Sequence, residues 1–474
     1  MKADGVIQVL NPATGECIAS VPDLCREAIT LAFDDAAAAL PEWRARTVED
    51  RCAIVGRLGD LLRRDAGRLA TIMTREQGKP LAEARGEVAY AAGFFDVAAH
   101  EAPPLLTRPL RTSLLPGGKE LRVLAQATGA TACITPWNFP IAMIARKLAP
   151  ALATGCTQVI KPDERTPLCA LALAALAEEA GVPAGVARTV TCEPSRFAAV
   201  AFSHPAVRFV SFTGSTEVGR LLIAHSAQRV VRLGLELGGL APFIVLEDAD
   251  VDAAVAQCAA SKFRNAGQTC ICANRILVHD RLHDSFVERL AARASSLRVG
   301  RGLSPGTEVG PLIDDDGMAK AERQVADALS RGARLVTGGH RVHVEGCLDR
   351  FLAPTVLADV PTTALCFREE TFGPIAPVAR FRLEDEAIAI ANAAPYGLAA
   401  YVCTRDTSRA DRLARELEAG IVGINDGTPS SPLAPFGGVK QSGWGREGGP
   451  EGLLEYCDLR MVSIGGAPPI GGAA

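Results

Sequence analysis

Cys270 is the residue of this chain whose setting best suits covalent chemistry. It follows Gly267, Gln268 and Thr269 within SKFRNAGQTCICANR, and such a flexible approach lets a side chain stand clear of its backbone. A cysteine attacks as the thiolate and needs a base or local dipoles, because a free thiol has a pKa of roughly 8.5. Residue type alone more often indicates a buried, inert thiol. A metal site is disfavoured, since the His residues lie far away and Cys-x-Cys lacks the ligand count of structural zinc.

Glu236 and Asn138 are candidate partners for that thiol. Glu236 lies in Leu-Glu-Leu-Gly-Gly at the end of an expected strand, where apolar neighbours would raise the pKa of its carboxyl toward that of a general base. A glutamate at such a position is otherwise more often solvated or salt-bridged. Asn138 lies in TPWNFPIAM, where a strand ends in a Pro-bounded turn, so its amide would face the crevice above a sheet and could hold an oxyanion.

Two further segments have the composition of anion-binding turns. VIKPDERTP places Lys161 and Glu164 directly after a strand, and FTGSTEVGR places Gly214, Ser215 and Gly219 at a strand-to-helix turn. A helix N-terminus with small residues can accept pyrophosphate oxygens. The signal is weak by itself, because Gly-x-x-x-x-Gly is not the dinucleotide fingerprint Gly-x-Gly-x-x-Gly.

A regular alternation of strands and helices positions these segments. Helical periodicity over about residues 30–100 is followed, from residue 130, by short apolar strands that alternate with helix-like stretches. This alternation predicts an α/β fold with a parallel, doubly wound sheet. Ligands bind beyond the carboxyl ends of the strands in such sheets, which is where the Pro-Trp-Asn, Lys-Pro and Thr-Gly-Ser segments fall. A second α/β block begins near residue 235.

Composition and charge exclude several classes of protein. The chain has 474 residues, too many for one ordinary core, so two or three domains are expected. Its 50 basic and 54 acidic side chains give a formal net charge of −4, which offers no electrostatic reason to bind nucleic acid or an anionic membrane. No segment has the apolar length of a membrane span or a secretory signal. The charge balance therefore makes small-molecule chemistry the default expectation. Fourteen scattered cysteines without a disulfide framework indicate a reduced, intracellular protein, and a cytoplasmic location is expected.

Seven segments together resemble the aldehyde dehydrogenase superfamily across nearly the whole chain. They occur in the order TPWNFP, KPDERTP, FTGSTEVG, LELGG, KFRNAGQTC, REETFGP and PFGGVKQSGWGREGG. SKFRNAGQTCICANR and GVKQSGWGREGG are most similar to its succinate-semialdehyde dehydrogenase branch. The resemblance implies a Rossmann-type parallel-sheet cofactor domain, an α/β catalytic domain and a small oligomerisation β element. The implied boundaries are an NAD-binding domain at 1–110 and 130–235, a catalytic domain at 236–430, an oligomerisation element at 111–129 and 450–466, and a flexible tail at 467–474.

The resemblance also implies covalent oxidation of an aldehyde. Cys270 matches the family's nucleophile, which forms a thiohemiacetal, passes hydride to a nicotinamide and leaves a thioester for hydrolysis. Glu236 matches the base that activates the hydrolytic water, and Asn138 with the Cys270 backbone N–H matches the oxyanion hole. Lys147 matches a lysine that supports the cofactor side of the site, with proton relay as a second role.

A nicotinamide dinucleotide is the implied cofactor. NAD is expected to be preferred, because a carboxylate at Glu164 accepts ribose hydroxyls but repels a 2′-phosphate. NADP is the alternative, since Lys161 and Arg165 would offset that repulsion. The residues that match the family's cofactor contacts are Thr135, Trp137, Lys161, Glu164, Gly214, Ser215, Gly219, Glu370 and Phe372.

A carboxylate-bearing semialdehyde is the implied substrate, with succinate semialdehyde as the first choice. Arg146, Arg264 and Ser430 match the branch's carboxylate-binding residues, and a guanidinium fork bonds a carboxylate bidentately. A lone arginine is otherwise more often part of an ion pair. Glutarate semialdehyde or broad-range, non-acylating oxidation are alternatives, because the surroundings of Thr428 and Pro432 differ from the branch. A catalytically silent relative is disfavoured, since all three central catalytic matches are present.

Cys272 is a candidate for redox regulation of Cys270. Some members of the branch carry a second cysteine two positions after the nucleophile, so a Cys270–Cys272 disulfide would switch activity off under oxidation. A merely packed thiol is the alternative, because an i, i+2 bridge requires a strained loop.

The hairpin near 121–127 and the tail strand near 456–463 would leave an exposed sheet edge in a monomer, so a homodimer or homotetramer is expected.

Overall fold

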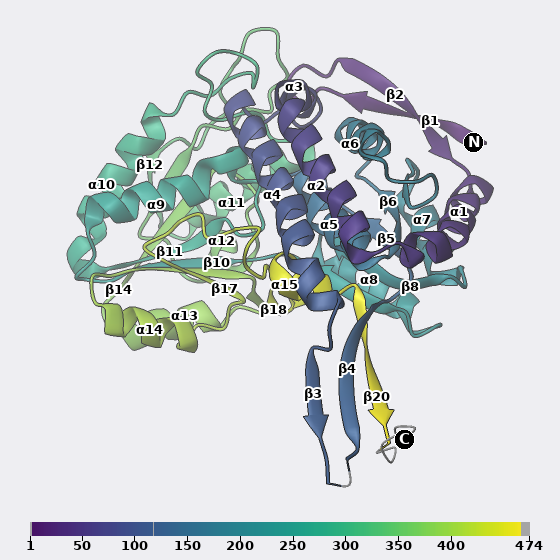
Figure 1. Ribbon diagram of the computed structural model, residues 1–474. Coiled ribbons are helices and arrows are strands. Elements are labelled where there is room, and N and C mark those ends of the chain that lie inside the picture. Colours follow the sequence, from purple (N-terminus) through teal and green to yellow (C-terminus); the bar gives the residue numbers. More distant parts are fainter. Residues whose placement is uncertain (1, 117, 466–474) are drawn as a thin grey trace, which may run out of the picture.

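The computed structural model describes residues 2–116 and 118–465. The expected flexible tail at 467–474 lies outside these described residues. Two α/β lobes lie side by side, and a narrow β arm projects from them (Figure 1). The α/β class predicted from the strand–helix alternation is confirmed.

The first lobe is built on a six-stranded sheet in the order β19-β9-β8-β5-β6-β7. The strands from β5 to β9 are parallel, and β19 is antiparallel to β9. The strands are β5 (Ala130–Ile134), β6 (Thr157–Lys161), β7 (Ala187–Thr189), β8 (Val207–Thr213), β9 (Arg232–Glu236) and β19 (Gly443–Trp444). The connecting helices are α5 (Ala142–Thr154), α6 (Pro167–Ala180), α7 (Pro194–Ser203) and α8 (Thr216–Ser226).

An antiparallel hairpin and four helices precede this sheet. They are β1 (Ala3–Leu10), β2 (Cys17–Leu24), α1 (Arg26–Ala45), α2 (Val48–Arg64), α3 (Ala66–Gln77) and α4 (Leu81–Leu106). Helices α2 to α6 share one large apolar core. Within that core all thirteen residues of α5 are buried, so any charged side chain on α5 needs a partner inside the protein.

The second lobe is built on a seven-stranded sheet in the order β12-β13-β14-β11-β10-β16-β17. Only β12, at the edge, is antiparallel to its neighbour among these described strands. The strands are β10 (Ala241–Val245), β11 (Ala273–His279), β12 (Arg334–Thr337), β13 (Thr355–Ala358), β14 (Ile375–Phe381), β16 (Ala399–Cys403) and β17 (Ile421–Ile424). The helices are α9 (Val251–Phe263), α10 (Asp280–Ser296), α11 (Asp315–Ser330), α12 (Leu365–Arg368), α13 (Glu384–Asn392) and α14 (Thr407–Glu416).

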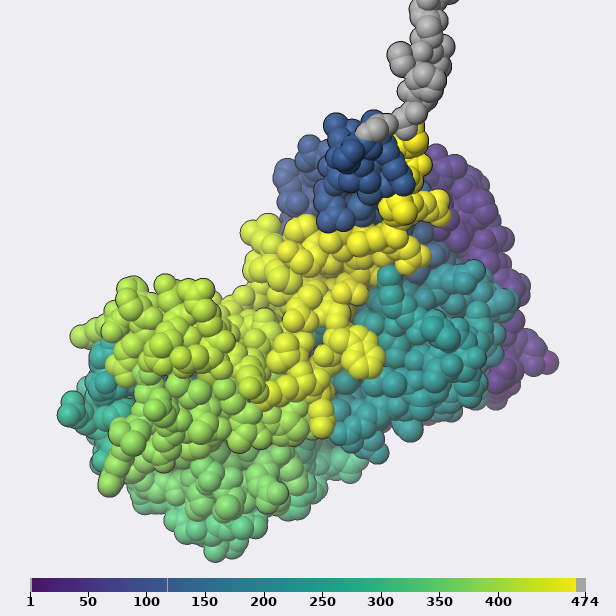
Figure 2. All heavy atoms as spheres, turned by 90° about the horizontal axis from the view of Figure 1, so that it is seen from below, coloured from purple at the N-terminus to yellow at the C-terminus, as the bar shows by residue number. Residues whose placement is uncertain are grey.

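The C-terminal segment returns from the second lobe to the first and then enters the arm. Figure 2 shows this segment, in yellow, between the two lobes. It contains β18 (Val439–Lys440), which pairs with β15 (Tyr396–Gly397), then β19, α15 (Gly449–Leu454) and β20 (Cys457–Ile464). In the arm β20 pairs with β4 (Glu120–Ala127), which pairs with β3 (Arg111–Leu114). Residues 431–449, which the sequence-based division leaves unassigned, thus join the first sheet through β19.

Among the described residues, none of the helices combines the length and apolar character needed to cross a membrane.

Candidate active site

Cys270 lies where two cavities meet. One, of about 330 Å³, extends from Cys270 toward the carboxyl ends of β8 and β9. The other, of about 390 Å³, is walled by α4 and by the segment around Ser430. Cys270 and Met143 line both cavities. Two molecules, one in each cavity, would therefore approach each other at the sulfur.

A third cavity continues the first one along the edge of the first sheet. It has a volume of about 470 Å³ and shares Trp137, Gly214 and Ser215 with the first cavity. Its far end is lined by Lys161, the last residue of β6, and by Glu164. The two cavities together form an elongated groove beyond the carboxyl ends of parallel strands, the usual place for a ligand in such sheets.

The backbone that leads to Cys270 is fixed in an unusual conformation. Asn265, Ala266 and Gly267 all have positive φ, at 52°, 54° and 73°. A Cβ on Gly267 would lie 2.2 Å from the carbonyl oxygen of Gly373, so only glycine fits. Left-handed non-glycine residues cost about 1–3 kcal/mol each and cluster at functional sites. The expected flexible approach is therefore wrong, because the chain before Cys270 is strained and closely packed.

The surroundings of Cys270 keep its thiol protonated. Burial raises the pKa of the Cys270 thiol to about 12, and the charge of Arg146 opposes that rise. The nearby carboxylates of Glu370 and Glu236 raise it further. A group that takes the proton is therefore needed at neutral pH.

Glu236 has the properties of such a base. It ends β9, is 3% exposed and faces the first cavity. Its Oε2 atom has no hydrogen-bond partner among the described residues. Burial, and then the charge of Glu447, raise the pKa of Glu236 well above its usual range, against the effect of Arg146 and Lys147. The expected desolvation of this carboxyl is present.

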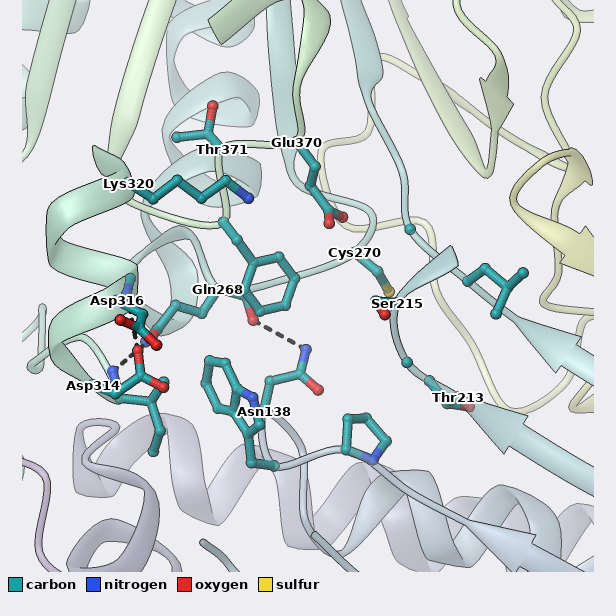
Figure 3. A pocket seen from close by; sticks show the side chains of 18 of the residues that line it. Asn138, Thr213, Ser215, Gln268, Cys270, Asp314, Asp316, Lys320, Glu370 and Thr371 are labelled. Atoms are coloured by element: carbon teal, nitrogen blue, oxygen red, sulfur yellow. Dashed lines mark hydrogen bonds between the residues drawn. The ribbon is translucent and has the colours of Figure 1, made fainter. Parts of the chain in front are cut away.

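Asn138 is held so that its amide faces Cys270. Its Nδ2 donates one hydrogen bond to the carbonyl oxygen of Gln268 at 3.1 Å (Figure 3). The backbone carbonyl oxygen of Asn138 accepts a hydrogen bond from Asn265 Nδ2 at 3.0 Å. The second hydrogen on Asn138 Nδ2 is left for another acceptor, as an oxyanion hole requires.

Helix α4 fixes both Asn138 and the start of α5. Glu87 of α4 accepts hydrogen bonds from the backbone N–H groups of Ile141 and Ala142 at 3.0 and 3.2 Å. Lys79 Nζ lies 2.5 Å from Glu87 and donates to the Asn138 carbonyl oxygen at 2.7 Å. A carboxylate at a helix N-terminus is favourable because it satisfies free N–H groups and complements the helix dipole.

Glu447 is a central residue of the site that the sequence-based reasoning assigned no role. Lys147 Nζ donates to Glu447 and, at 2.7 Å, to Thr213 Oγ1. Arg146 Nε lies 2.5 Å from Glu447, and its guanidinium lies 4.1 Å from the Phe436 ring centroid. The fully buried α5 is the signal that predicts such a partner, because two adjacent cations cannot be buried without a counter-charge.

On the side of Cys270 that faces the first cavity, acidic and aromatic groups line the groove. Glu370 accepts a hydrogen bond from the Gly239 N–H at 3.0 Å, and burial raises the pKa of its carboxyl. Trp137 and Phe372 make an edge-to-face contact with ring centroids 5.6 Å apart. Lys320, which the sequence-based reasoning did not single out, points into the same cavity as Glu370 (Figure 3).

The far end of the groove carries paired charges. Lys161 forms an ion pair with Glu164, three residues along the chain. Arg165 is held by Asp163 at 2.9 Å and Asp314 at 2.8 Å. Arg165 therefore has two carboxylate partners already and is less able to serve a phosphate.

The strand-to-helix turn at 213–219 is shaped by small residues. Ser215 caps α8, since its Oγ accepts a hydrogen bond from the Val218 N–H at 3.2 Å. Gly219 lies on the buried face of α8, where a Cβ would lie 2.7 Å from the Leu237 side chain. Thr135 lines the third cavity, and its buried Oγ1 has no partner among the described residues.

The cavity on the other side of Cys270 gathers the three residues expected to bind a carboxylate. Arg146, Arg264 and Ser430 all line it. Ser430 Oγ lies 2.5 Å from the hydroxyl oxygen of Tyr90, a further lining residue. Arg264 differs from Arg146, because Arg146 forms an ion pair with Glu447 and no ion pair of Arg264 is found among the described residues.

Cys272 lies beside the site but faces away from it. Its side chain is buried at 1% exposure, and its thiol donates to the carbonyl oxygen of Lys262 at 3.6 Å. All fourteen cysteines of the chain are free thiols in the structure.

Comparisons with known proteins agree with the motifs. A family model described as the aldehyde dehydrogenase family matches residues 1–462. The chain is similar to a glutarate-semialdehyde dehydrogenase of Pseudomonas aeruginosa, at 49% identity over 97% of this chain and 94% of that protein. It is similar to an NADP(+) succinate-semialdehyde dehydrogenase of Escherichia coli, at 50% identity with the same coverage. A crystal structure of an aldehyde dehydrogenase from Brucella melitensis superposes with a TM-score of 0.95 at 49% identity, covering 98% of this chain and 95% of that chain. The resemblance inferred from the motifs is confirmed.

Proposed function

The chain belongs to the aldehyde dehydrogenase family, whose members use NAD(P), and from this premise we propose that it oxidises a semialdehyde bearing a carboxylate, with succinate semialdehyde as the best candidate. The observation that carries the proposal is the position of Cys270 between a dinucleotide-sized groove and a cavity lined by Arg264 and Ser430. Two guanidinium groups and a hydroxyl suit a carboxylate better than an uncharged tail.

In the proposed reaction Cys270 forms and breaks the covalent bond to the substrate. Its sulfur bonds to the aldehyde carbon while the thiol proton leaves for Glu236 and then for solvent. The developing oxyanion is held by Asn138 Nδ2 and by the Cys270 backbone N–H. When bound, the nicotinamide ring of the cofactor supplies the hydride acceptor. Glu236 then takes a proton from the water that attacks the resulting thioester, which releases the carboxylic acid and the free thiol.

In this proposal Lys147 and Arg146 support the chemistry from helix α5. Both share the counter-charge of Glu447, so the helix that carries them keeps its position beside Glu236. In this proposal Lys147 stabilises the cofactor side through Thr213, and Arg146 presents the rest of its guanidinium to the substrate cavity.

The groove fits a dinucleotide by the chemistry of its donors and acceptors. The unpartnered Thr135 hydroxyl and the N-terminus of α8 at Gly214 and Ser215 suit the phosphates and sugars of a dinucleotide. The partly buried carboxylates of Glu370 and Glu164, at the two ends of the groove, suit ribose hydroxyls. We assign Glu370 and Phe372 to the nicotinamide half, with Trp137 between the halves. Lys161 and Glu164 belong to the adenosine half in this assignment.

We propose NAD as the preferred cofactor. Glu164 would accept ribose hydroxyls and repel a 2′-phosphate. Arg165, which would relieve that repulsion, is engaged by Asp163 and Asp314. The E. coli relative is named as an NADP(+) enzyme, so NADP is the alternative.

Glutarate semialdehyde is the second candidate substrate. A relative named glutarate-semialdehyde dehydrogenase has about the same identity to this chain as the succinate-semialdehyde relative. The cavity of about 390 Å³ leaves room for an additional methylene group. Broad-range oxidation is less well supported, because it does not use the arginines.

A kinetic series tests the proposal. NADH formation is measured with ω-semialdehydes of three to six carbons and with uncharged aldehydes of equal length, with and without coenzyme A. We expect the highest kcat/KM for the four- or five-carbon semialdehyde and no stimulation by coenzyme A. Equal kcat/KM for charged and uncharged aldehydes would contradict the proposed substrate class.

Three further assignments complete the proposal. We assign residues 1–110 and 130–235 to NAD binding, 236–430 to catalysis, and 111–129 with 450–466 to oligomerisation as a homodimer or homotetramer. The assignment of the arm to oligomerisation is supported by the long pairing of β4 with β20 and by the exposed side chains of Leu459 and Met461.

The cysteines support two further assignments. The free thiols support a cytoplasmic location. We assign Cys272 to reversible redox regulation of Cys270.

A further inference from the structure

Cys270 lies at the corner of a hydrogen-bonded turn. The N–H of Cys272 donates to the carbonyl oxygen of Thr269 at 3.0 Å, so Cys270 and Ile271 are the two central residues of a β-turn. This turn carries both the sulfur and the backbone N–H assigned to the oxyanion. The position of the reacting groups therefore depends on what holds the turn.

Two buried side chains of the second lobe hold the far half of this turn. The hydroxyl of Tyr401, on β16, donates to the carbonyl oxygen of Ile271 at 2.5 Å. The hydroxyl oxygen of Ser261, on α9, accepts a hydrogen bond from the Ala273 N–H at 3.1 Å. Tyr401 is 1% exposed and Ser261 is 3% exposed, so water does not replace these bonds in the folded protein.

Tyr401 is itself rigidly placed. Strand β16 lies between β10 and β17, with Tyr401 opposite Phe243 on one side and Gly423 on the other. The two rings lie 5.6 Å apart, and a Cβ on Gly423 would lie 3.0 Å from the Tyr401 ring. Burial raises the pKa of the Tyr401 hydroxyl, which keeps it a hydrogen-bond donor. The ring cannot swing without disturbing three strands.

We infer that Tyr401 is a positioning residue for Cys270, because its hydroxyl holds the Ile271 carbonyl and thereby sets the direction of the sulfur and of the backbone N–H. The inference rests on the proposed role of Cys270 as the nucleophile. A displacement of about 1 Å at a reacting group can cost about 100-fold in rate. Tyr401 lines neither of the two cavities that form the dinucleotide groove, so the loss of its hydroxyl acts on the chemical step and spares cofactor binding.

Tyr401→Phe removes the hydroxyl and keeps the ring. The matched control is Thr404→Val, one residue after the same strand, which removes a buried hydroxyl bonded to Asp248 at 2.8 Å. Thr404 lines none of the three cavities of the site. Four quantities are compared with wild type: kcat, the cofactor KM, the melting temperature, and the rate of Cys270 carbamidomethylation as a function of pH, with the alkylated residue located by peptide mass spectrometry.

The expected result is a kcat lower by about tenfold or more in Tyr401→Phe, with cofactor KM changed by less than about twofold and an altered pH profile of Cys270 alkylation. Thr404→Val should lower the melting temperature and leave the other quantities unchanged. If Tyr401→Phe does not fold, Ser261→Ala removes the second hydrogen bond that holds the far half of the turn and should show the same pattern. An unchanged kcat and alkylation profile would overturn the inference, as would an equal loss of kcat in Thr404→Val. Full activity in Cys270→Ser would instead overturn the proposed function.

Discussion

The ammonium group of Lys147 is hydrogen-bonded to the carboxylate of Glu447, which lies 300 residues further along the chain. The same carboxylate is the partner of Arg146 and the second cause, after burial, of the raised pKa of Glu236. Glu447 thus neutralises the buried cations of α5 and helps to keep the pKa of the Glu236 carboxyl high enough for it to act as a base.

Replacing Glu447 by Gln should shift the pH dependence of kcat. The negative charge of Glu447 raises the pKa of Glu236, so its removal lowers that pKa and leaves Lys147 and Arg146 to lower it further. The acid limb of the kcat–pH profile should therefore move by about one unit to lower pH, with kcat at neutral pH down by about tenfold. The loss of one partner of a buried ion pair should also cost about 3 kcal/mol of stability. Glu451→Gln, at an exposed site on α15, serves as the control. An acid limb that stays in place or moves to higher pH would refute this electrostatic link.

Arg264→Ala should weaken recognition of charged substrates selectively. A charge-assisted hydrogen bond contributes about 1.5–3 kcal/mol, so kcat/KM for succinate semialdehyde should fall by about 10- to 100-fold. The value for butanal should change by less than about threefold. Arg85→Ala, on the exposed face of α4, gives the control for removing an arginine near the cavity. Equal losses for the two aldehydes would show that Arg264 does not bind the carboxylate.

Glu164→Gln should move the cofactor preference toward NADP. The substitution removes the charge that would repel a 2′-phosphate and frees Lys161, the present partner of Glu164. The ratio of kcat/KM for NADP to that for NAD should rise by about tenfold or more, which corresponds to about 1.4 kcal/mol. Steady-state kinetics with both cofactors gives the ratio. A wild-type enzyme that already prefers NADP would contradict the assigned role of Glu164.

Peroxide should inactivate the enzyme reversibly through Cys272. Peroxide oxidises the Cys270 thiol to a sulfenic acid with release of one water, and attack by the Cys272 thiol then forms the disulfide and releases a second water. Because the Cys272 thiol points to Lys262, the turn must open before the sulfurs meet, so the second step should be slow. Dithiothreitol should restore activity to wild type and not to Cys272→Ala. The same recovery in both proteins would leave Cys272 as a packed thiol.

The regular part of the fold could be predicted because it has local signals. The segment at 157–161 is expected as a strand from its apolar run and is β6 in the structure. Helix α6 has Pro167 at its start and Gly181 with φ 95° after its end. The hairpin of β1 and β2 was not predicted, since Val9 is the only fully buried residue of β1 and no apolar alternation marks the strand.

The candidate site was predictable where a motif carries its own chemistry. Cys270, Glu236 and Asn138 lie in segments with distinctive composition, and they line one cavity. Glu447 lies in the distinctive segment PFGGVKQSGWGREGG, but nothing in that segment marks its carboxylate as the partner of Lys147. Tyr401 has no comparable signal, because it acts through a carbonyl oxygen that the fold alone brings near. The small residues before Cys270 suggested flexibility, whereas tertiary packing holds them in left-handed conformations.

The central claim is that Cys270 carries the acyl group and Glu236 removes it. Glu236→Gln is mixed with NAD and succinate semialdehyde at alkaline pH, where hydroxide takes the thiol proton in place of the carboxylate. NADH formation is followed by stopped flow, and the acylated peptide is located by mass spectrometry after quenching. The account predicts a burst of one NADH per active site, slow turnover thereafter, and one succinyl group on Cys270. A steady rate equal to that of wild type, or an acyl group on another residue, would contradict it.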